Sequence, residues 1–259
     1  MPSRVTFREN DRSQVPFQVI AKPVADLLSD LSGHRFRLVI EGLNWWSDFD
    51  LFEVHYPSWA ARFLPNRNQP DTEDLRIDRV LSTFYREAKV KADEGVKITL
   101  PNGTTQTVEG QGALGKFRAE VLEQYAQNAR SSHFDAVGFG KNCVFLVNNR
   151  PALPFILDVD VAGWKNDQGE ASSCKCRPTN FTTRGLKELL DLRQRLELEF
   201  QAGCLQIYLI TFDSTVILED RIWELSEGPP FLNPDDYHAI GFERLPHLKK
   251  GEPYRYLSA

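Results

Sequence analysis

The sequence has no long apolar run of the kind that a membrane-spanning segment needs. Its longest hydrophobic runs have the length of a β-strand, whereas a helix that crosses a bilayer needs about 20 apolar residues. The opening residues, MPSRVTFREN, also lack the apolar stretch of a secretory signal. We therefore expect a soluble, cytoplasmic protein.

Cysteine is scarce as well, and several well-known site motifs are missing. The four cysteines, Cys143, Cys174, Cys176 and Cys204, are too few and too scattered for a disulfide framework, so we expect free thiols. Cys174-Lys-Cys176 has no second cysteine pair at zinc-finger spacing. The chain has no GxxxxGK[ST], GxGxxG or HExxH motif, which argues against nucleoside triphosphate, dinucleotide and zinc-protease sites.

An excess of positive charge is absent too. The chain of 259 residues has 31 basic and 36 acidic residues and a net charge of −5. This balance argues against a protein that coats nucleic acid without selectivity, although it leaves room for a local basic groove. With 41% hydrophobic residues the composition is that of an ordinary globular protein.

Residues 1–110 are predicted to form a β-rich section with one long helix. Short apolar segments at 15–20, 36–40 and 51–55, each bounded by turn-forming residues, indicate strands. From Asp71 the apolar residues take helical spacing. Residues 96–109 then predict a hairpin around Asn102-Gly103, because this pair favours tight turns.

Residues 111–213 are predicted to form an α/β core with a mixed sheet. The expected order is helix, three strands, helix and strand, at 113–129, 134–139, 143–148, 155–162, 183–200 and 205–211. A hairpin gives antiparallel pairing, and the later helix permits a crossover to another strand. Residues 214–259, rich in proline and aromatic residues, are predicted to wrap on the body or to contact a partner chain.

The segment PFILDVDVAGW, residues 154–164, places two aspartates in a predicted strand. Because strand side chains alternate, Asp158 and Asp160 share one face. Convergent carboxylates are a suitable seat for Mg²⁺, a cation that binds oxygen ligands and keeps several waters. The same alternation is also typical of the solvated face of a half-buried strand, so both interpretations stay open.

The order of elements and these acidic residues resemble the PD-(D/E)xK phosphodiesterase superfamily, which includes many type II restriction endonucleases. The resemblance covers about residues 112–213 and implies a restriction-endonuclease-like αβββαβ core. It also implies a metal-dependent nuclease that hydrolyses phosphodiester bonds in DNA or RNA, with Mg²⁺ or Mn²⁺ as cofactor. Homodimerisation would suit an enzyme that cuts both strands of a duplex.

Carried over residue by residue, the resemblance places the metal ligands and the catalytic cation. Asp135, in HFDAVGF, takes the position of the first aspartate, and Asp158 lies on the third strand. Glu120 or Glu123 would be the carboxylate of the first helix. The sequence departs from the family at Asp160, which stands where the pattern has lysine and would assist the metal-binding carboxylates. The lysine would then come from elsewhere, and the two candidates are Lys187 and Lys175.

Two other functions fit the same residues. A non-catalytic binding or assembly module, such as a viral or defence-system interaction protein, would use the α/β core only as a scaffold. The acidic net charge and the missing lysine favour it. A metal-dependent hydrolase acting on a smaller substrate would share the carboxylates and differ in the size of its pocket.

Overall fold

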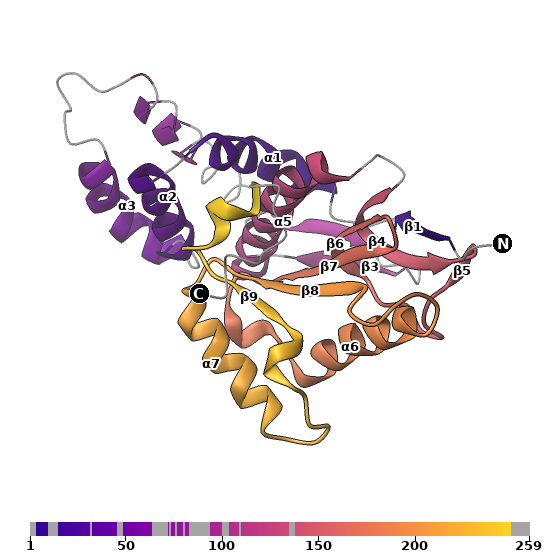
Figure 1. Cartoon of the computed structure of the whole chain (residues 1–259). Coiled ribbons are helices and arrows are strands. Elements are labelled where there is room, and N and C mark those ends of the chain that lie inside the picture. The colour runs from indigo at the N-terminus through magenta and orange to yellow at the C-terminus, as the bar shows by residue number, and fades with distance from the viewer. Residues whose placement is uncertain are drawn as a thin grey trace. The chain divides into compact units, whose positions relative to one another are not determined.

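The computed structural model divides the chain into two compact units, which we describe separately (Figure 1). The larger unit comprises Met1–Asn10 and Ala126–Ala259, and the smaller unit comprises Asp11–Tyr125. The structure describes residues 4–9, 15–31, 33–45, 49–63, 72, 74–75, 77–79, 81–82, 94–99, 104–108, 110–134 and 138–249.

The larger unit is built on a mixed sheet with the strand order β1-β4-β6-β7-β8-β9. Pairing is antiparallel from β1 to β7 and parallel from β7 to β9. The strands are β1 (Val5–Glu9), β4 (Phe139–Val147), β6 (Val159–Lys165), β7 (Gln168–Cys174), β8 (Leu205–Ile210) and β9 (His238–Ile240), with the short β5 (Arg150–Pro151) paired to β4. The predicted α/β class with a mixed sheet is confirmed.

Two tight turns set the register of the antiparallel strands. Asn148 and Asn149 connect β4 to β5 with φ of 51° and 64°, and Asn166 and Asp167 connect β6 to β7 with φ of 54° and 60°. Type I′ hairpin turns have positive φ at both central residues, and asparagine and aspartate tolerate that region better than other residues with side chains. The second turn pairs Lys165 with Gln168.

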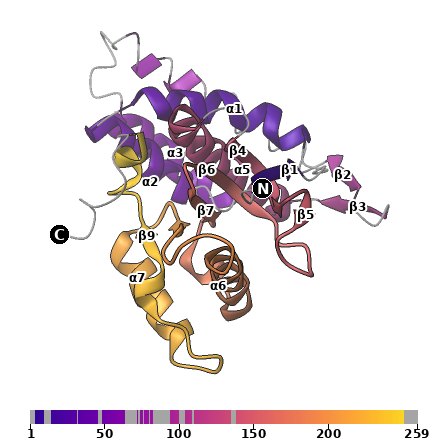
Figure 2. The ribbon, with the colours of Figure 1, turned by 45° about the vertical axis from the view of Figure 1, so that its right-hand side comes forward.

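Two helices make the crossovers between the parallel strands. α6 (Thr183–Glu197) lies between β7 and β8 in the chain, and α7 (Thr215–Ser226) lies between β8 and β9. Each begins at a capping side chain: Thr182 Oγ1 accepts from the backbone N–H of Gly185, and Ser214 Oγ accepts from that of Ile217. Figure 2 shows α6 and α7 beside the parallel part of the sheet.

The core of this unit lies between the sheet and these helices. α6 contributes one apolar stripe, and the central strands contribute the facing side chains. The members on α6 are Leu186, Leu189, Leu192 and Leu196, and those on β8 are Leu205, Ile207 and Leu209. Their spacing on α6 follows the helical period that the sequence predicted.

A buried ion pair joins three segments of the larger unit. Arg130, the last residue of α5 (Gln111–Arg130), makes a bidentate pair with Glu170 on β7 and donates to the carbonyl of Leu248 at 3.0 Å. Burial raises the pKa of Glu170, and the Arg130 charge opposes that shift. Leu248 belongs to the short helix η5 (Leu245–Lys249), so this arginine ties the end of the described chain to the sheet.

The smaller unit is mainly helical, which corrects the prediction of a β-rich section. The predicted strands at 15–20, 36–40 and 51–55 lie in α1 (Val15–Asp30), α2 (Gly33–Trp45) and α3 (Phe49–Phe63). The predicted hairpin is confirmed as β2 (Val96–Thr99) and β3 (Thr105–Val108). The described residues between 72 and 82 are helical, as their spacing predicted.

Strands lie between the predicted helices α5 and α6, but they do not coincide with the predicted strands, and three strand positions were wrong. A single strand, β4, replaces the predicted strands at 134–139 and 143–148, with Asn142 kept inside it at φ 45°. The strand predicted at 155–162 is β6 and starts later, at Val159. β7 was not predicted. The described part of the predicted C-terminal segment, 214–249, contributes α7 and the edge strand β9.

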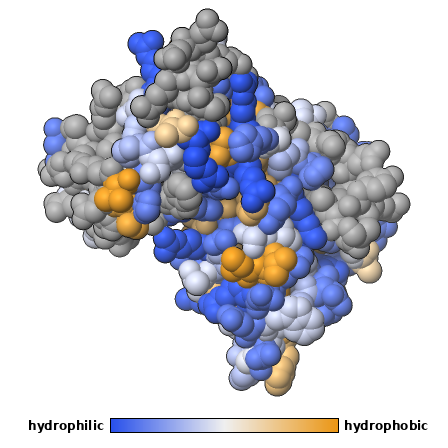
Figure 3. Space-filling view, turned by 90° about the vertical axis from the view of Figure 1, so that its left-hand side faces the viewer, coloured by the Kyte–Doolittle hydropathy of each residue, from blue (hydrophilic) through white to orange (hydrophobic). Residues whose placement is uncertain are grey.

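Apolar side chains on the surface are dispersed. In the part of the chain that the structure describes, no helix combines the length and the hydrophobicity needed to cross a membrane. Figure 3 shows hydrophobic side chains as small separate patches among hydrophilic ones on one face. On α7, Val216, Ile217 and Trp223 are exposed.

Candidate functional site

Asp160 is an acidic residue inside the central sheet. It is the second residue of β6, and only 3% of its surface is exposed. Its Oδ2 accepts the backbone N–H of Cys174, on the neighbouring strand β7, at 2.7 Å. A buried carboxylate needs such donors, because burial without hydrogen bonds is costly. Asp160 is therefore not a residue of a solvated strand face.

Lys175 supplies a positive charge beside this carboxylate. Its Nζ lies 3.5 Å from Asp160 Oδ2, and its side chain is 38% exposed. Its backbone N–H donates to the carbonyl of Ile210, the last residue of β8, at 2.9 Å. The lysine is thus anchored where β7 and β8 end, with its charge directed to the buried aspartate.

The pair lies at the edge of the sheet that is formed by the carboxyl ends of its parallel strands. β7, β8 and β9 are parallel, so their carboxyl ends, at Cys174, Ile210 and Ile240, lie at the same edge. β6 is antiparallel to β7, which brings its beginning, with Asp160, to that edge. Ligands of open α/β sheets bind outside the carboxyl ends of the strands.

Two helices also begin at this edge. α6 follows the end of β7, and α7 follows the end of β8. The first turn of α7 is held by Glu243, whose Oε2 accepts from the backbone N–H and from Oγ1 of Thr215, both at 3.0 Å. Helix N-termini carry partial positive charge and favour anionic groups.

Positive side chains follow Lys175 along the chain. Arg177 is exposed in the segment that leads to α6, and Arg184 and Lys187 are exposed on its first turns. Arg184 pairs with Glu188 through an Nε–Oε1 contact of 2.7 Å, which offsets its charge. Despite the acidic balance of the whole chain, this segment next to the Asp160–Lys175 pair is basic.

The other predicted site residues do not join this pair. Asp158 lies before β6 and is exposed, so it is not on the strand with Asp160. Lys187 is exposed on α6. Glu120 is buried in the part of α5 that belongs to the smaller unit, as is Glu123. Asp135 lies outside the described residues.

The described residues bring no metal-binding cluster together, and their cysteines are thiols. Among the residues that the structure describes, no three His, Cys, Asp or Glu side chains come together as a metal site. The four cysteines are buried and free, as predicted. Cys174 is the last residue of β7, and Cys176 is buried in the segment that follows this strand. Burial raises the pKa of the Cys204 thiol.

The site was only partly visible in the sequence because β7 was missed. The signal for β7 was the Asn166-Asp167 pair, which separates two strand-length segments, VDVAGWK and QGEASSC. A hairpin at this turn would have placed Lys175 at the end of the strand next to Asp160. The residue two positions before Lys175 is Ser173, and it is half-buried near the end of β7.

Comparisons with known proteins give no family. No protein-family model and no curated protein matches the chain. A solved structure, protein VC1899 from Vibrio cholerae, is similar with a TM-score of 0.41 and 15% identity. The match covers 95% of this chain and 57% of that protein, so this chain spans little more than half of its length.

Proposed function

We propose that the protein is a metal-dependent nuclease in which Asp160 binds the metal ion and Lys175 contacts the phosphate. The observation that supports the proposal is the Asp160–Lys175 pair, 3.5 Å apart at the carboxyl edge of the sheet. It lies in a core whose order is α5, β4, β6, β7, α6 and β8, the order that the nuclease resemblance implies.

The observed strands change which residues the resemblance selects. Asp160, near the beginning of the second core strand, takes the position assigned in the sequence to Asp135. Lys175, directly after the third core strand, takes the lysine position and displaces Lys187.

Asp160 would give Mg²⁺ or Mn²⁺ one protein ligand, so waters and the substrate would have to supply the others. Mg²⁺ is commonly held by one or two carboxylates, several waters and the phosphates of the substrate. Asp160 would supply a carboxylate oxygen, and the ion would supply a bound water of lowered pKa and charge neutralisation at the phosphate. Lys175 would stabilise the negative charge that develops on the phosphate oxygens.

The surroundings favour a nucleic acid over a neutral substrate. Arg177 and Lys187 are exposed near the pair and would contact the phosphate backbone. The beginning of α6 lies at the same edge and favours anions, whereas the first turn of α7 already holds the Glu243 carboxylate. DNA is the proposed substrate, with RNA as the variant to test, and two copies of the chain would cut both strands of a duplex in the cytoplasm.

Conversion of supercoiled plasmid to nicked and linear forms, with Mg²⁺ or Mn²⁺, tests the proposal. Asp160→Asn keeps an oxygen acceptor for the Cys174 N–H and removes the negative charge, so we expect cleavage to fall by about 100-fold or more without unfolding. Lys175→Met should also lower the cleavage rate. Asp167→Asn is the matched control, because Asp167 is exposed in a turn that asparagine tolerates.

Further measurements identify the substrate and test the assigned site. A single-stranded RNA and a single-stranded DNA of the same sequence identify the substrate. Equal cleavage by Asp160→Asn and the unchanged protein would refute the assigned site. Intact DNA and RNA with every divalent ion would refute the nuclease.

A non-catalytic binding module is the second candidate, and one observation favours it. Ser173 stands two positions before Lys175, where the resemblance has an acidic metal ligand. With Ser173 in that position, Asp160 would serve as an acceptor that holds Cys174 and Lys175 in place. Asp160→Asn would then leave partner binding unchanged and lower only the stability.

A further inference from the structure

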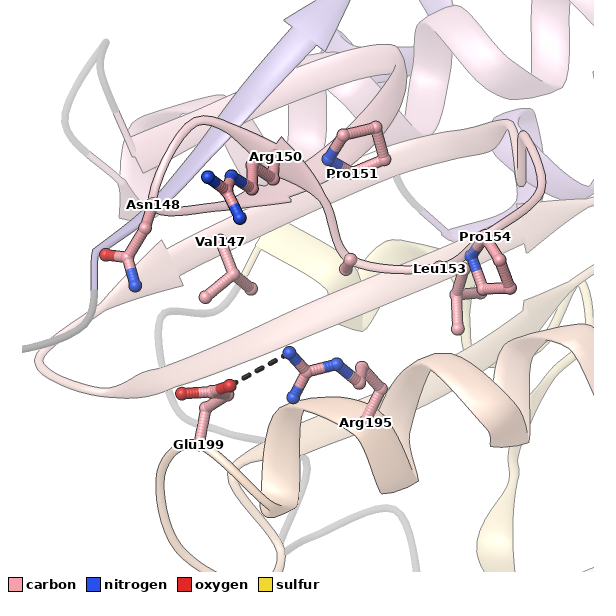
Figure 4. Close-up of a pocket in the computed structure, with 9 residues that line it drawn as sticks. Val147, Asn148, Arg150, Pro151, Leu153, Pro154, Arg195 and Glu199 are labelled. Atoms are coloured by element: carbon pink, nitrogen blue, oxygen red, sulfur yellow. Dashed lines mark ion pairs between the residues drawn. The ribbon is translucent and has the colours of Figure 1, made fainter.

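A pocket of about 460 Å³ lies in the larger unit between the β4–β5 hairpin and the C-terminal end of α6. Figure 4 shows Asn148 and Arg150 of the hairpin on one side and Arg195 and Glu199 on the other. Neither Asp160 nor Lys175 lines it, so it is distinct from the candidate nuclease site. Its volume is within the range of small-molecule sites.

The charged residues that line the pocket, Arg150, Arg195 and Glu199, give it a net positive charge. Arg195 Nη2 lies 2.8 Å from Glu199 Oε1, one turn further along the chain, and both side chains are about one third exposed. Glu199 therefore holds the guanidinium of Arg195 in one orientation and neutralises it. Arg150 forms no ion pair with any residue that the structure describes, so its charge remains available to a ligand.

The hairpin fixes the position of Arg150. Arg150 pairs in register with Val147 across the Asn148-Asn149 turn. Asn148 Oδ1 accepts the backbone N–H of Arg4 at 3.0 Å, which sets the orientation of its amide and leaves Nδ2 as a donor. A backbone fixed in this way preorganises the donors of the pocket, which lowers the entropy cost of binding.

The remaining wall is apolar and stiff. Val147 and Leu153 are buried in the core and present one face to the pocket, and Pro151 and Pro154 flank Leu153 in the chain. Proline restricts the backbone, so this wall keeps its shape. A ligand would meet an apolar surface beside the arginines.

We propose that this pocket binds an organic phosphate, with a phosphate monoester at the arginines and an apolar or aromatic body against Leu153 and the prolines. Arginine presents a planar set of donors that matches phosphate oxygens, and two arginines with the Asn148 amide can serve three of them. A phosphate head offers three oxygens to these three donors, whereas a carboxylate offers only two.

Isothermal titration of the full chain with phenyl phosphate tests this site. We expect saturable binding with Kd at or below about 1 mM, and about tenfold weaker binding to Arg150→Gln and to Arg195→Gln. Arg150 is exposed, so Arg150→Gln should unfold at the same temperature as the unchanged protein. Arg37→Gln is the matched control and should bind as before, because Arg37 is an exposed arginine on α2 that pairs with Glu41 as Arg195 pairs with Glu199, and it does not line the pocket.

Three further probes separate the parts of the ligand. Inorganic phosphate and benzoate should bind more weakly than phenyl phosphate, and phenol should not bind. No saturation by phenyl phosphate up to about 10 mM would refute the site. Equal loss of affinity in Arg37→Gln would refute the assignment to this pocket, and equal affinity for inorganic phosphate would refute the apolar subsite. These outcomes are independent of whether the protein cleaves DNA.

Discussion

Replacement of Asp160 by alanine should lower the stability of the protein through one specific backbone group. The Cys174 N–H donates to Asp160 Oδ2 at 2.7 Å inside the sheet, and the shorter side chain would leave this donor without its acceptor. A buried donor that loses its partner costs about 1–3 kcal/mol. The main part of the effect therefore comes from the hydrogen bond and only a smaller part from charge.

The ion pair with Lys175 adds less. At 3.5 Å the Coulomb attraction is about 1.2 kcal/mol in water and about 4.7 kcal/mol at an effective dielectric constant of 20. Since 38% of the lysine side chain is exposed, solvent screening reduces the net value to about 0.5–1 kcal/mol. Asp160→Ala should cost about 2–3 kcal/mol in total, and Asp160→Asn about 1 kcal/mol.

Urea unfolding followed by circular dichroism measures these differences. In a double-mutant cycle with Lys175→Met, the coupling energy should be about 0.5–1 kcal/mol, well below the full cost of Asp160→Ala. The midpoint of thermal unfolding should fall by roughly 5–10 °C for Asp160→Ala. If Asp160→Ala were as stable as the unchanged protein, the buried hydrogen bond would not carry the weight assigned to it.

Three other changes have clear expected outcomes. Gly241→Ala should lower stability by about 1–3 kcal/mol, because the added Cβ would lie 2.1 Å from the backbone nitrogen of Thr215, the first residue of α7. Gly185→Ala is the matched change: its Cβ would have no contact under 3.4 Å, so it should raise stability by about 0.5 kcal/mol. Burial, with the charge of Arg193, lowers the pKa of His238, so on acidification the unfolded chain binds a proton at this histidine before the folded chain does. Stability should therefore fall as the pH drops below about 6.5, the ordinary histidine pKa, by at most about 1.4 kcal/mol per pH unit. Arg130→Met should cost about 3–5 kcal/mol, because it leaves Glu170 buried without its partner, and the double change to two methionines should recover much of that loss.

Each of these outcomes has its own control in denaturant unfolding. His238→Gln should flatten the pH dependence of stability between about pH 7.5 and 5.5. A double variant at Arg130 and Glu170 no more stable than Arg130→Met would contradict the ion-pair explanation. Equal stability of Gly241→Ala and Gly185→Ala would contradict the close approach at Gly241.

The fold was predictable where apolar residues keep the helical spacing over a long segment. Helix α5 was predicted at 113–129 and observed at 111–130, and helix α6 was predicted at 183–200 and observed at 183–197. The first 63 residues were misread, because a window of five or six residues shows only an apolar run. A longer window shows Phe17, Ala21, Val24 and Leu28, all buried on one side of α1. Pro23, which argues against a helix, lies inside this one.

The site was less predictable, because it depends on which strands are neighbours. The sequence singled out Asp160 and Lys175 but gave no reason to pair them, since fifteen positions separate them and the strand between them went unrecognised. Asp158 looked equivalent to Asp160 by alternation. β6 begins only at Val159, so Asp158 lies outside the strand and is exposed, whereas Asp160 lies inside it and is buried.

The larger unit takes its two edge strands from opposite ends of the chain. Val5 pairs with Val147 on one edge, and Ile240 pairs with Ile210 on the other, while residues 11–125 form a separate unit between them. During synthesis on the ribosome, the helical insert can complete its fold early, whereas the first strand must wait for β4. The sheet is finished only when residue 240 has left the exit tunnel, so a stalled nascent chain would expose the bare edge of β8 to chaperones and proteases.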